Sequence, residues 1–271
     1  MTIKTEPITG HITKDFHNIP RMVWCYDLKD KTVENDDYKL EILSPRYPEN
    51  AINMLRQAIL PDDYVVLWSK KRHAVVMSDT PMERYTNQAF IENAKGNVLI
   101  GGLGIGMLIA GLIWKNVQSD DQIVDSITVI EKDSVLIELM KPIIEDFADF
   151  VSYDLGYSVT LNIIQDDVYT YPDKHPEKKY DYVYIDIWDD YIGYREYQDT
   201  FLTLKELYQN ITDHFDAWGY FDAFHNEDGL SPIEQSEFAE YTANMVNYRV
   251  ANREYPKEIL DNLDEYANAI Q

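Results

Sequence analysis

The residues of this sequence that could do chemistry follow short apolar runs. The first group is a glycine cluster that comes just after residues 98–100: Gly102, Gly104 and Gly106. Glycines let a backbone bend sharply and approach a ligand closely, because no Cβ stands in the way. An apolar, helix-like run begins near Met107, and the start of such a helix directs its free N–H groups back toward the bend. The cluster is therefore predicted to cradle a nucleotide or a carboxylate.

Acidic residues follow three later apolar runs: Glu131, then Asp166 and Asp167, then Asp186 and Asp189. One carboxylate can accept two hydrogen bonds from the neighbouring hydroxyls of a ribose, which is the role that we predict for Glu131. Asp166 is predicted to accept a hydrogen bond from an adenine amino group. We assign Asp167 to the same cofactor site, with a helix cap as its alternative role. The alternative for Glu131 is a solvated surface acid.

Asp186 is the candidate catalytic residue, because a carboxylate at the end of a strand could hold a ligand group and accept a proton from it. Asp189 is the second catalytic candidate and would help to bind a cationic ligand. Trp188 lies between them in the sequence and offers an aromatic face to a cation. The alternative is that both aspartates cap a loop and that Trp188 packs inside the protein. The sequence has no Cys/His spacing typical of zinc sites, so no metal is expected.

The elements expected to position these residues alternate between strand and helix. Buried strands are expected at residues 98–100, 126–133, 159–167, 181–190 and 217–224. Helices are expected at residues 80–93, from Met107 onward, at 134–150 and at 197–215. This alternation predicts an α/β fold with a doubly wound, Rossmann-like parallel sheet. Ligands of such sheets bind beyond the carboxyl ends of the strands, so the glycine cluster and the acids are expected to meet there.

A β-rich region and a helical region are expected to flank this sheet. Residues 1–80 are predicted to form hairpins from strands at 21–26 and 38–43 and at 64–68 and 73–77, with a helix at 51–60. Residues 229–271 are predicted to form a C-terminal helical extension, opened by a capping box at Ser231 and Glu234. The predicted domains are therefore residues 1–80, 81–228 and 229–271.

Charge and cysteine content limit the partners and the compartment. The 271 residues carry a formal net charge of −24, and so acidic a surface repels phosphate backbones, which argues against nucleic acid as a partner. The apolar run at 98–114 is short for a membrane span and rich in glycine, so no membrane partner is expected. The single cysteine, Cys25, allows no intrachain disulfide and is expected to be a buried thiol. These features predict a cytoplasmic protein.

The glycine spacing distinguishes between two nucleotide families. The fingerprint of NAD sites is Gly-x-Gly-x-x-Gly, whose third glycine would fall at Met107, whereas this chain has Gly-x-Gly-x-Gly. The latter spacing resembles the S-adenosylmethionine (SAM) site of class I methyltransferases. The segments VLIGGLGIG, TVIEKD, IIQDD and YDYVYIDIWDD occur in the order and spacing of that family. Within it, the chain looks most like the spermidine synthase branch, through the patterns Ile130-Glu131-Lys132-Asp133 and Asp186-Ile187-Trp188-Asp189.

A second resemblance lies just before the glycine cluster. The segment VVMSDTPMERYTNQAF is similar to guanidinoacetate methyltransferase and to small methyltransferase-like proteins found in phage genomes. Together the resemblances imply that residues 81–228 bind SAM or decarboxylated SAM. They also imply transfer to a small-molecule acceptor that bears an amine and could be cationic, and they suggest a homodimer.

Three functions follow from these resemblances and stay open. The first is a methyltransferase. The second is a polyamine aminopropyltransferase, which the Asp-x-x-Asp pattern favours and which Asp190 disfavours, since spermidine synthases carry proline there. The third is a non-catalytic structural or interaction protein on the same fold, because a fold does not imply a function.

Overall fold

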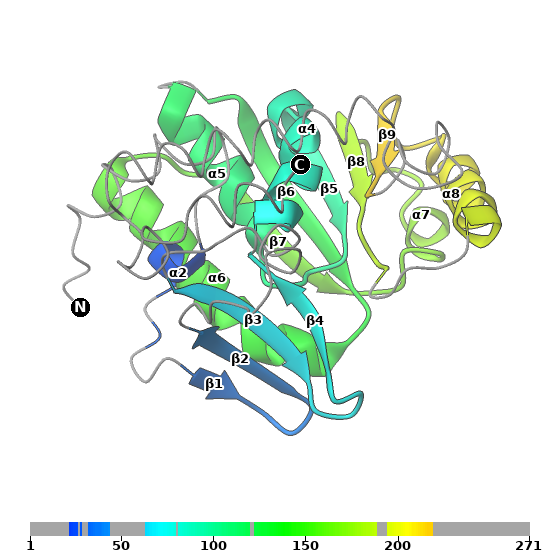
Figure 1. Cartoon of the computed structure of the whole chain (residues 1–271). Coiled ribbons are helices and arrows are strands. Elements are labelled where there is room, and N and C mark those ends of the chain that lie inside the picture. The colour runs from blue at the N-terminus through cyan, green and yellow to red at the C-terminus, as the bar shows by residue number, and fades with distance from the viewer. Residues whose placement is uncertain are drawn as a thin grey trace, which may run out of the picture.

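The computed structural model describes residues 22–26, 28, 32–43, 63–79, 81–119, 122–188 and 194–218, which form two β-sheets and the helices around them (Figure 1). Several sequence predictions lie outside the described residues. These are the helix at 51–60, the C-terminal extension at 229–271 and the position of Asp189. The division into three domains stays a prediction.

The larger sheet is fully parallel and has the order β7-β6-β5-β8-β9. Its strands are β5 (Gly96–Gly101), β6 (Val124–Glu131), β7 (Thr160–Gln165), β8 (Tyr182–Ile185) and β9 (Phe215–Ala217). From β5 the chain proceeds outward through β6 to β7, and then returns to place β8 on the other side of β5. The point at which the strand order reverses is therefore between β5 and β8. The predicted α/β fold with a doubly wound, Rossmann-like sheet is confirmed.

Helices cover both faces of this sheet, and residues along β5 alternate between the two faces. The helices are α4 (Pro81–Asn93), α5 (Met107–Ser119), α6 (Ser134–Leu155), α7 (Tyr171–Lys174) and α8 (Tyr194–Tyr208). Val98 and Ile100 pack into a core shared with α4, α5 and α6. Leu99 points into a second core, which contains Phe201 of α8 and Tyr171 of α7. Such burial on both faces explains why β5 is a continuous apolar run.

The smaller sheet precedes α4 and is an antiparallel meander in the order β1-β2-β3-β4. Its strands are β1 (Thr32–Glu34), β2 (Tyr38–Leu43), β3 (Tyr64–Ser69) and β4 (Ala74–Ser78). The predicted strand at 38–43 and the predicted hairpin of β3 and β4 are confirmed. Leu40 and Leu67 are fully buried and belong to the same core as α5 and α6. Packing against that core therefore holds the meander on the α/β unit.

The strand predicted at residues 21–26 is wrong, because these residues contain the short helix α2 (Met22–Cys25), and β2 pairs with β1 instead. A short apolar run does not distinguish a strand from a buried helix. The buried carboxylate of Asp79 accepts from the Met22 N–H at the start of α2 and from the Val65 N–H of β3, both at 2.8 Å. This carboxylate thus satisfies an N–H group that the helix itself leaves without a partner. Cys25, expected to be a buried thiol, is half-buried, and desolvation raises the pKa of its thiol well above the usual value, which disfavours a nucleophilic role.

Two boundaries on the far side of the sheet also differ from prediction. The helix expected at 197–215 is α8, which ends at Tyr208, and β9 begins at Phe215, two residues before the strand expected at 217–224. Residues 219–224 of that predicted strand lie outside the described residues. A turn ends the helix, because Ile211 and Thr212 both donate to the Tyr208 carbonyl. Phe215 then pairs with Val183 of β8 and packs against the second core. The register of β8 sets this boundary, and local sequence does not reveal it.

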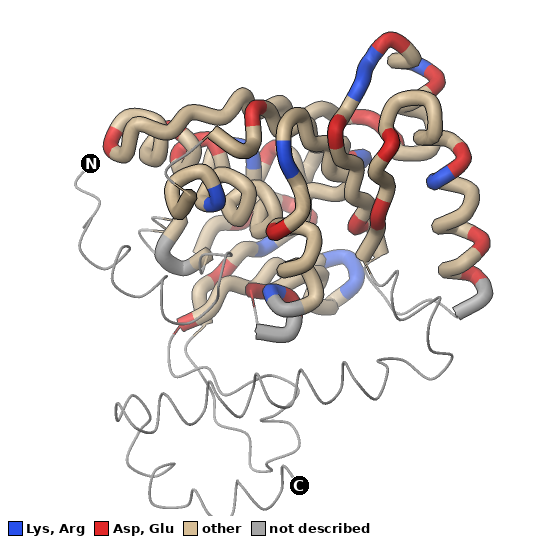
Figure 2. Tube along the Cα trace, turned by 90° about the horizontal axis from the view of Figure 1, so that it is seen from above, with Lys and Arg blue, Asp and Glu red and all other residues tan. Residues whose placement is uncertain are grey.

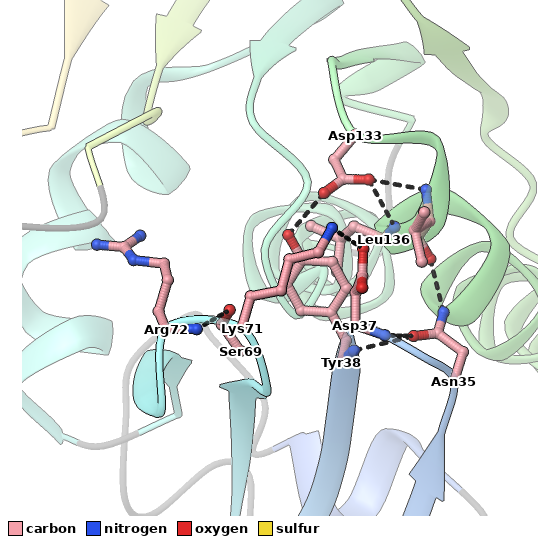
Figure 3. A network of polar contacts seen from close by, with 9 residues as sticks. Asn35, Asp37, Tyr38, Ser69, Lys71, Arg72, Asp133 and Leu136 are labelled. Carbon is pink, nitrogen blue, oxygen red and sulfur yellow. Dashed lines mark hydrogen bonds and ion pairs between the residues drawn. The ribbon is translucent and has the colours of Figure 1, made fainter.

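A polar network joins the meander to the start of α6 (Figure 3). Tyr38 donates its hydroxyl to Asp133 at 2.7 Å, and the Asn35 side-chain amide donates to the Val135 carbonyl at 2.8 Å. Asp133 is also the N-cap of α6, where its side chain accepts from the N–H groups of Val135 and Leu136. The turn between β6 and α6 is therefore held from two sides, and Glu131 lies directly before it.

Acidic residues occur along much of the described chain, as Figure 2 shows, in keeping with the net charge of −24. None of the helices in the described part of the chain is both long and apolar enough to cross a bilayer.

Candidate functional site

A cavity of about 440 Å³ lies where the strands of the parallel sheet end. The glycine bend lines it with Gly102 and Gly104, and four elements contribute acids. These acids are Glu83, Glu131, Asp166, Asp167 and Asp186. Aromatic side chains complete the lining: Tyr38, Tyr169, Trp188 and Trp218. The predicted site residues therefore surround one cavity, apart from Gly106, which is buried behind the bend, and Asp189, which lies outside the described residues.

The glycine bend has a backbone that only glycine adopts easily. Its three glycines have positive φ angles: +100° at Gly102, +48° at Gly104 and +72° at Gly106. A Cβ on Gly102 would lie 1.9 Å from the backbone oxygen of Asp186. The Asp186 N–H in turn donates to the Gly101 carbonyl at 2.7 Å. The bend and the end of β8 are thus in direct backbone contact, and this contact fixes Asp186 beside the bend.

Glu131 is bound to the same bend through its carboxylate. One carboxylate oxygen accepts from the Leu103 N–H at 3.0 Å, and the other accepts from the Asp133 N–H at 2.8 Å. An ionised carboxylate has about four acceptor positions, so roughly two remain for a ligand. Glu131 therefore combines a structural contact with free acceptor capacity at the cavity wall.

Asp166 and Asp167 carry ion pairs at the end of β7. Asp166 pairs with Lys174 and also accepts from the Asp167 N–H at 2.7 Å. The hydrogen bond from Lys174 holds the pKa of Asp166 below its usual value. Asp167 pairs with Lys132 at 2.8 Å, and this bond lowers the pKa of Asp167. Both acids are therefore ionised at neutral pH and can accept hydrogen bonds from a ligand's N–H groups.

The helix-cap alternative for Asp167 receives partial support from the geometry. Its side chain accepts from the Tyr169 N–H at 3.0 Å and so stabilises the turn that leads into α7. The N-cap residue of α7 itself is Thr170, whose side chain forms no capping bond.

Asp186 is partly buried at the end of β8 and has an unusual titration. Burial, followed by the negative charge of Glu83, raises the pKa of Asp186 to about 8. Burial likewise raises the pKa of Glu83 to about 7. A carboxyl group whose pKa lies near the working pH is suited to accept and release a proton.

Sequence reasoning singled out neither Glu83 nor Met77, and it also missed the aromatic lining residues Tyr38, Tyr169 and Trp218. Glu83 lies in the first turn of α4, and only the packing of α4 over β8 brings it to the cavity. Met77 lies on β4. Its sulfur accepts from the Ile105 N–H at 3.4 Å and would lie 2.3 Å from a Cβ on Gly104. No local signal in the sequence indicates that β4 covers one side of the bend.

Trp188 both packs against a neighbour and faces the cavity. Its ring lies 4.8 Å from the ring of Tyr197, measured between centroids, and it also contributes to the cavity lining. The two alternatives raised for Trp188 are therefore compatible. Within the described ranges, no group of three or more His, Cys, Asp or Glu side chains could hold a metal ion.

No family model matches this chain, and no curated protein is significantly similar to it. Similar solved structures include a spermidine synthase from Thermotoga maritima, with 13% identity and a TM-score of 0.39 over 80% of this chain and 61% of that one. Another is MnmC2 from Aquifex aeolicus, with 19% identity and a TM-score of 0.36 over 55% and 53% of the two chains. A third is a putative caffeoyl-CoA O-methyltransferase from Staphylococcus aureus, with 15% identity and a TM-score of 0.32 over 62% and 72%. The chain thus spans about three fifths of the spermidine synthase that it matches.

Proposed function

We propose that this protein is a SAM-dependent transferase, most simply a methyltransferase that acts on a small amine-bearing acceptor. The observation that carries the proposal is the bond between the Leu103 N–H and the Glu131 carboxylate. It joins a glycine bend and a strand-end acid at one cavity wall, at the place where doubly wound sheets bind nucleotides.

The chemistry of the cavity wall fits an adenosyl group. Gly102 and Gly104 leave room for close approach by a ligand, and Glu131 has acceptor positions for the two ribose hydroxyls. Apolar side chains beside these groups offer a surface for a purine ring: Ile130, Leu136 and Val168. Asp166 and Asp167 provide acceptors for an exocyclic amino group. A volume of about 440 Å³ lies within the range of small-molecule sites.

Bound SAM would supply a methyl carbon made electrophilic by a sulfonium cation. The acids in the cavity wall favour a cationic ligand, and Trp188 adds an aromatic face. Asp186 orients the acceptor nitrogen and accepts the proton that this nitrogen loses. Its raised pKa makes its carboxylate a stronger base than an exposed aspartate. Asp189 would assist in binding a cationic acceptor, as the sequence predicts.

Aminopropyl transfer is the second candidate, and the acidic cavity favours it because both the donor and the acceptor of that reaction are cations. Incubation with decarboxylated SAM and putrescine, in parallel with SAM and a panel of amines, separates the two reactions. If product forms only with the decarboxylated donor, the protein is an aminopropyltransferase and the proposal of methyl transfer fails.

Calorimetry tests the proposal before any acceptor is known. We expect SAM and methylthioadenosine to bind and NAD to bind weakly or not at all. Absence of binding by both adenosyl compounds would refute the proposal and favour a non-catalytic protein. The Asp186→Asn variant should bind the nucleoside within about twofold of the parent, and turnover should fall at least about 100-fold. Unchanged turnover would remove Asp186 from the mechanism.

A further inference from the structure

Glu83 and Asp186 face the same cavity from different elements. The Tyr184 hydroxyl donates to the Asn87 side chain at 2.9 Å, which fixes α4 over β8. Asp186 comes directly after β8, and its N–H still donates to the Gly101 carbonyl of β5 at 2.7 Å, so its side chain follows that of Tyr184 toward α4. Residues four apart on a helix share a face, so Glu83 lies beside Asn87 on the side that meets β8. The register of the two elements thus brings the two carboxyl groups together.

The two carboxyl groups have no counter-charge within the described part of the chain. No hydrogen bond or ion pair there reaches either side chain. Burial raises the pKa of both groups, and the negative charge of Glu83 further raises the pKa of Asp186. The one basic side chain among the described lining residues is Lys132, and its ammonium group is paired with Asp167 at 2.8 Å. Two neighbouring buried carboxyl groups that lack a counter-charge have raised pKa values, and a cation bound between them would favour the ionised form of both.

The walls beside these carboxyl groups restrict the kind of cation. Trp188 and Trp218 line the same cavity, and the Trp218 indole N–H donates to the Thr86 hydroxyl at 3.1 Å, which places Trp218 beside α4. Aromatic faces attract organic cations. An alkylammonium group has several N–H donors, enough to reach two carboxylates, and its carbon chain can lie against an indole ring.

We propose that Glu83 and Asp186 together bind the primary ammonium group of the acceptor, with Glu83 as an acceptor-binding residue. This inference rests on the proposed function and extends it in two respects. It adds a binding residue on α4, and it names the acceptor class as a primary alkylamine rather than an alcohol, a thiol or a neutral ring. Glu83 positions the nitrogen, and Asp186 receives its proton.

The test is a calorimetric titration of n-butylamine into the full chain, with and without S-adenosylhomocysteine, with n-butanol as the neutral probe. We expect n-butylamine to bind and n-butanol not to bind. Glu83→Gln should weaken n-butylamine binding by roughly 10- to 100-fold, the range expected for one charged hydrogen bond. The affinity of that variant for S-adenosylhomocysteine should stay within about twofold of the parent. Glu92→Gln, at an exposed position of the same helix, serves as the matched control and should change neither affinity.

The outcomes separate this inference from the proposed function. Equal n-butylamine affinity in Glu83→Gln and the parent would overturn the role of Glu83, as would equal binding of n-butylamine and n-butanol by the parent. A parent protein that binds S-adenosylhomocysteine but no n-butylamine also overturns the inference and leaves the proposed function intact. If S-adenosylhomocysteine does not bind, the proposed function fails, and the titrations without it still decide whether Glu83 binds the amine. If Glu83→Gln does not fold, the two probes on the parent decide the matter.

Discussion

Replacement of Asp186 by asparagine should change how the stability of the protein depends on pH. The usual pKa of this group is 3.8, whereas burial and the charge of Glu83 raise the pKa of Asp186 to about 8. Between these two values the folded protein keeps a proton that the unfolded chain has lost. The unfolded state therefore binds fewer protons, and the free energy of unfolding falls as the pH rises. Asp186→Asn removes this dependence because its amide does not titrate.

The size of the effect follows from the number of protons involved. One proton changes the free energy of unfolding by about 1.4 kcal/mol per pH unit. Between about pH 5 and pH 7, the free energy of unfolding of Asp186→Asn should therefore rise by ~2.7 kcal/mol relative to that of the parent. Any constant difference in packing between the two side chains cancels in this comparison.

Urea unfolding followed by circular dichroism at several pH values measures this difference. Asp125→Asn serves as the control, because Asp125 is exposed on β6, and this variant should follow the parent curve. Parallel stability curves for Asp186→Asn and the parent would show that Asp186 titrates as an ordinary aspartate. That result would contradict the burial argument and, with it, the reason for treating Asp186 as a strong base.

Three further predictions concern the bend and the network around it. Gly102→Ala should lower the free energy of unfolding by more than about 3 kcal/mol, because the cost of a positive φ adds to that of a backbone overlap. Gly156 has a positive φ but open space around it, so Gly156→Ala should cost only about 1 kcal/mol in the same urea unfolding experiment. Tyr38→Phe removes the hydroxyl that donates to Asp133 and should lower the free energy of unfolding by about 1 kcal/mol; an unchanged value would mean that the bond adds nothing. Glu131→Gln should weaken calorimetric binding of S-adenosylhomocysteine by at least about tenfold, and an affinity equal to that of the parent would remove Glu131 from the ribose site.

The part of the fold that could be predicted from sequence is the part in which neighbouring segments of the chain carry clear local signals. A buried run, a glycine bend and an apolar helix follow one another within residues 96–119, and only a parallel strand covered on both faces satisfies that order. Glu131 was predictable for the same reason, since the end of an apolar strand marks the edge of the sheet. These local signals indicated the edge of the sheet at which the cavity lies, together with its glycines and four of its acids.

The remainder depended on contacts between segments far apart in the chain. The first N–H of α2, that of Met22, is accepted by the Asp79 carboxylate, a contact across 57 positions. Glu83 belongs to the cavity because α4 lies over β8, which the sequence of α4 does not reveal. Met77 reaches the bend only through the packing of the meander on the α/β unit. Hydrophobic periodicity contains no information on such pairings.

The contact between Gly102 and the carbonyl oxygen of Asp186 restricts how this protein can evolve. One backbone contact fixes the spacing between the glycine bend and the acid at the end of β8. Substitutions at the bend would disturb both sides of the cavity at once, so neither side can diverge alone by that route. Under the proposed function, new acceptor preferences would instead arise from side chains on α4 and from the two tryptophans, which take no part in that backbone contact.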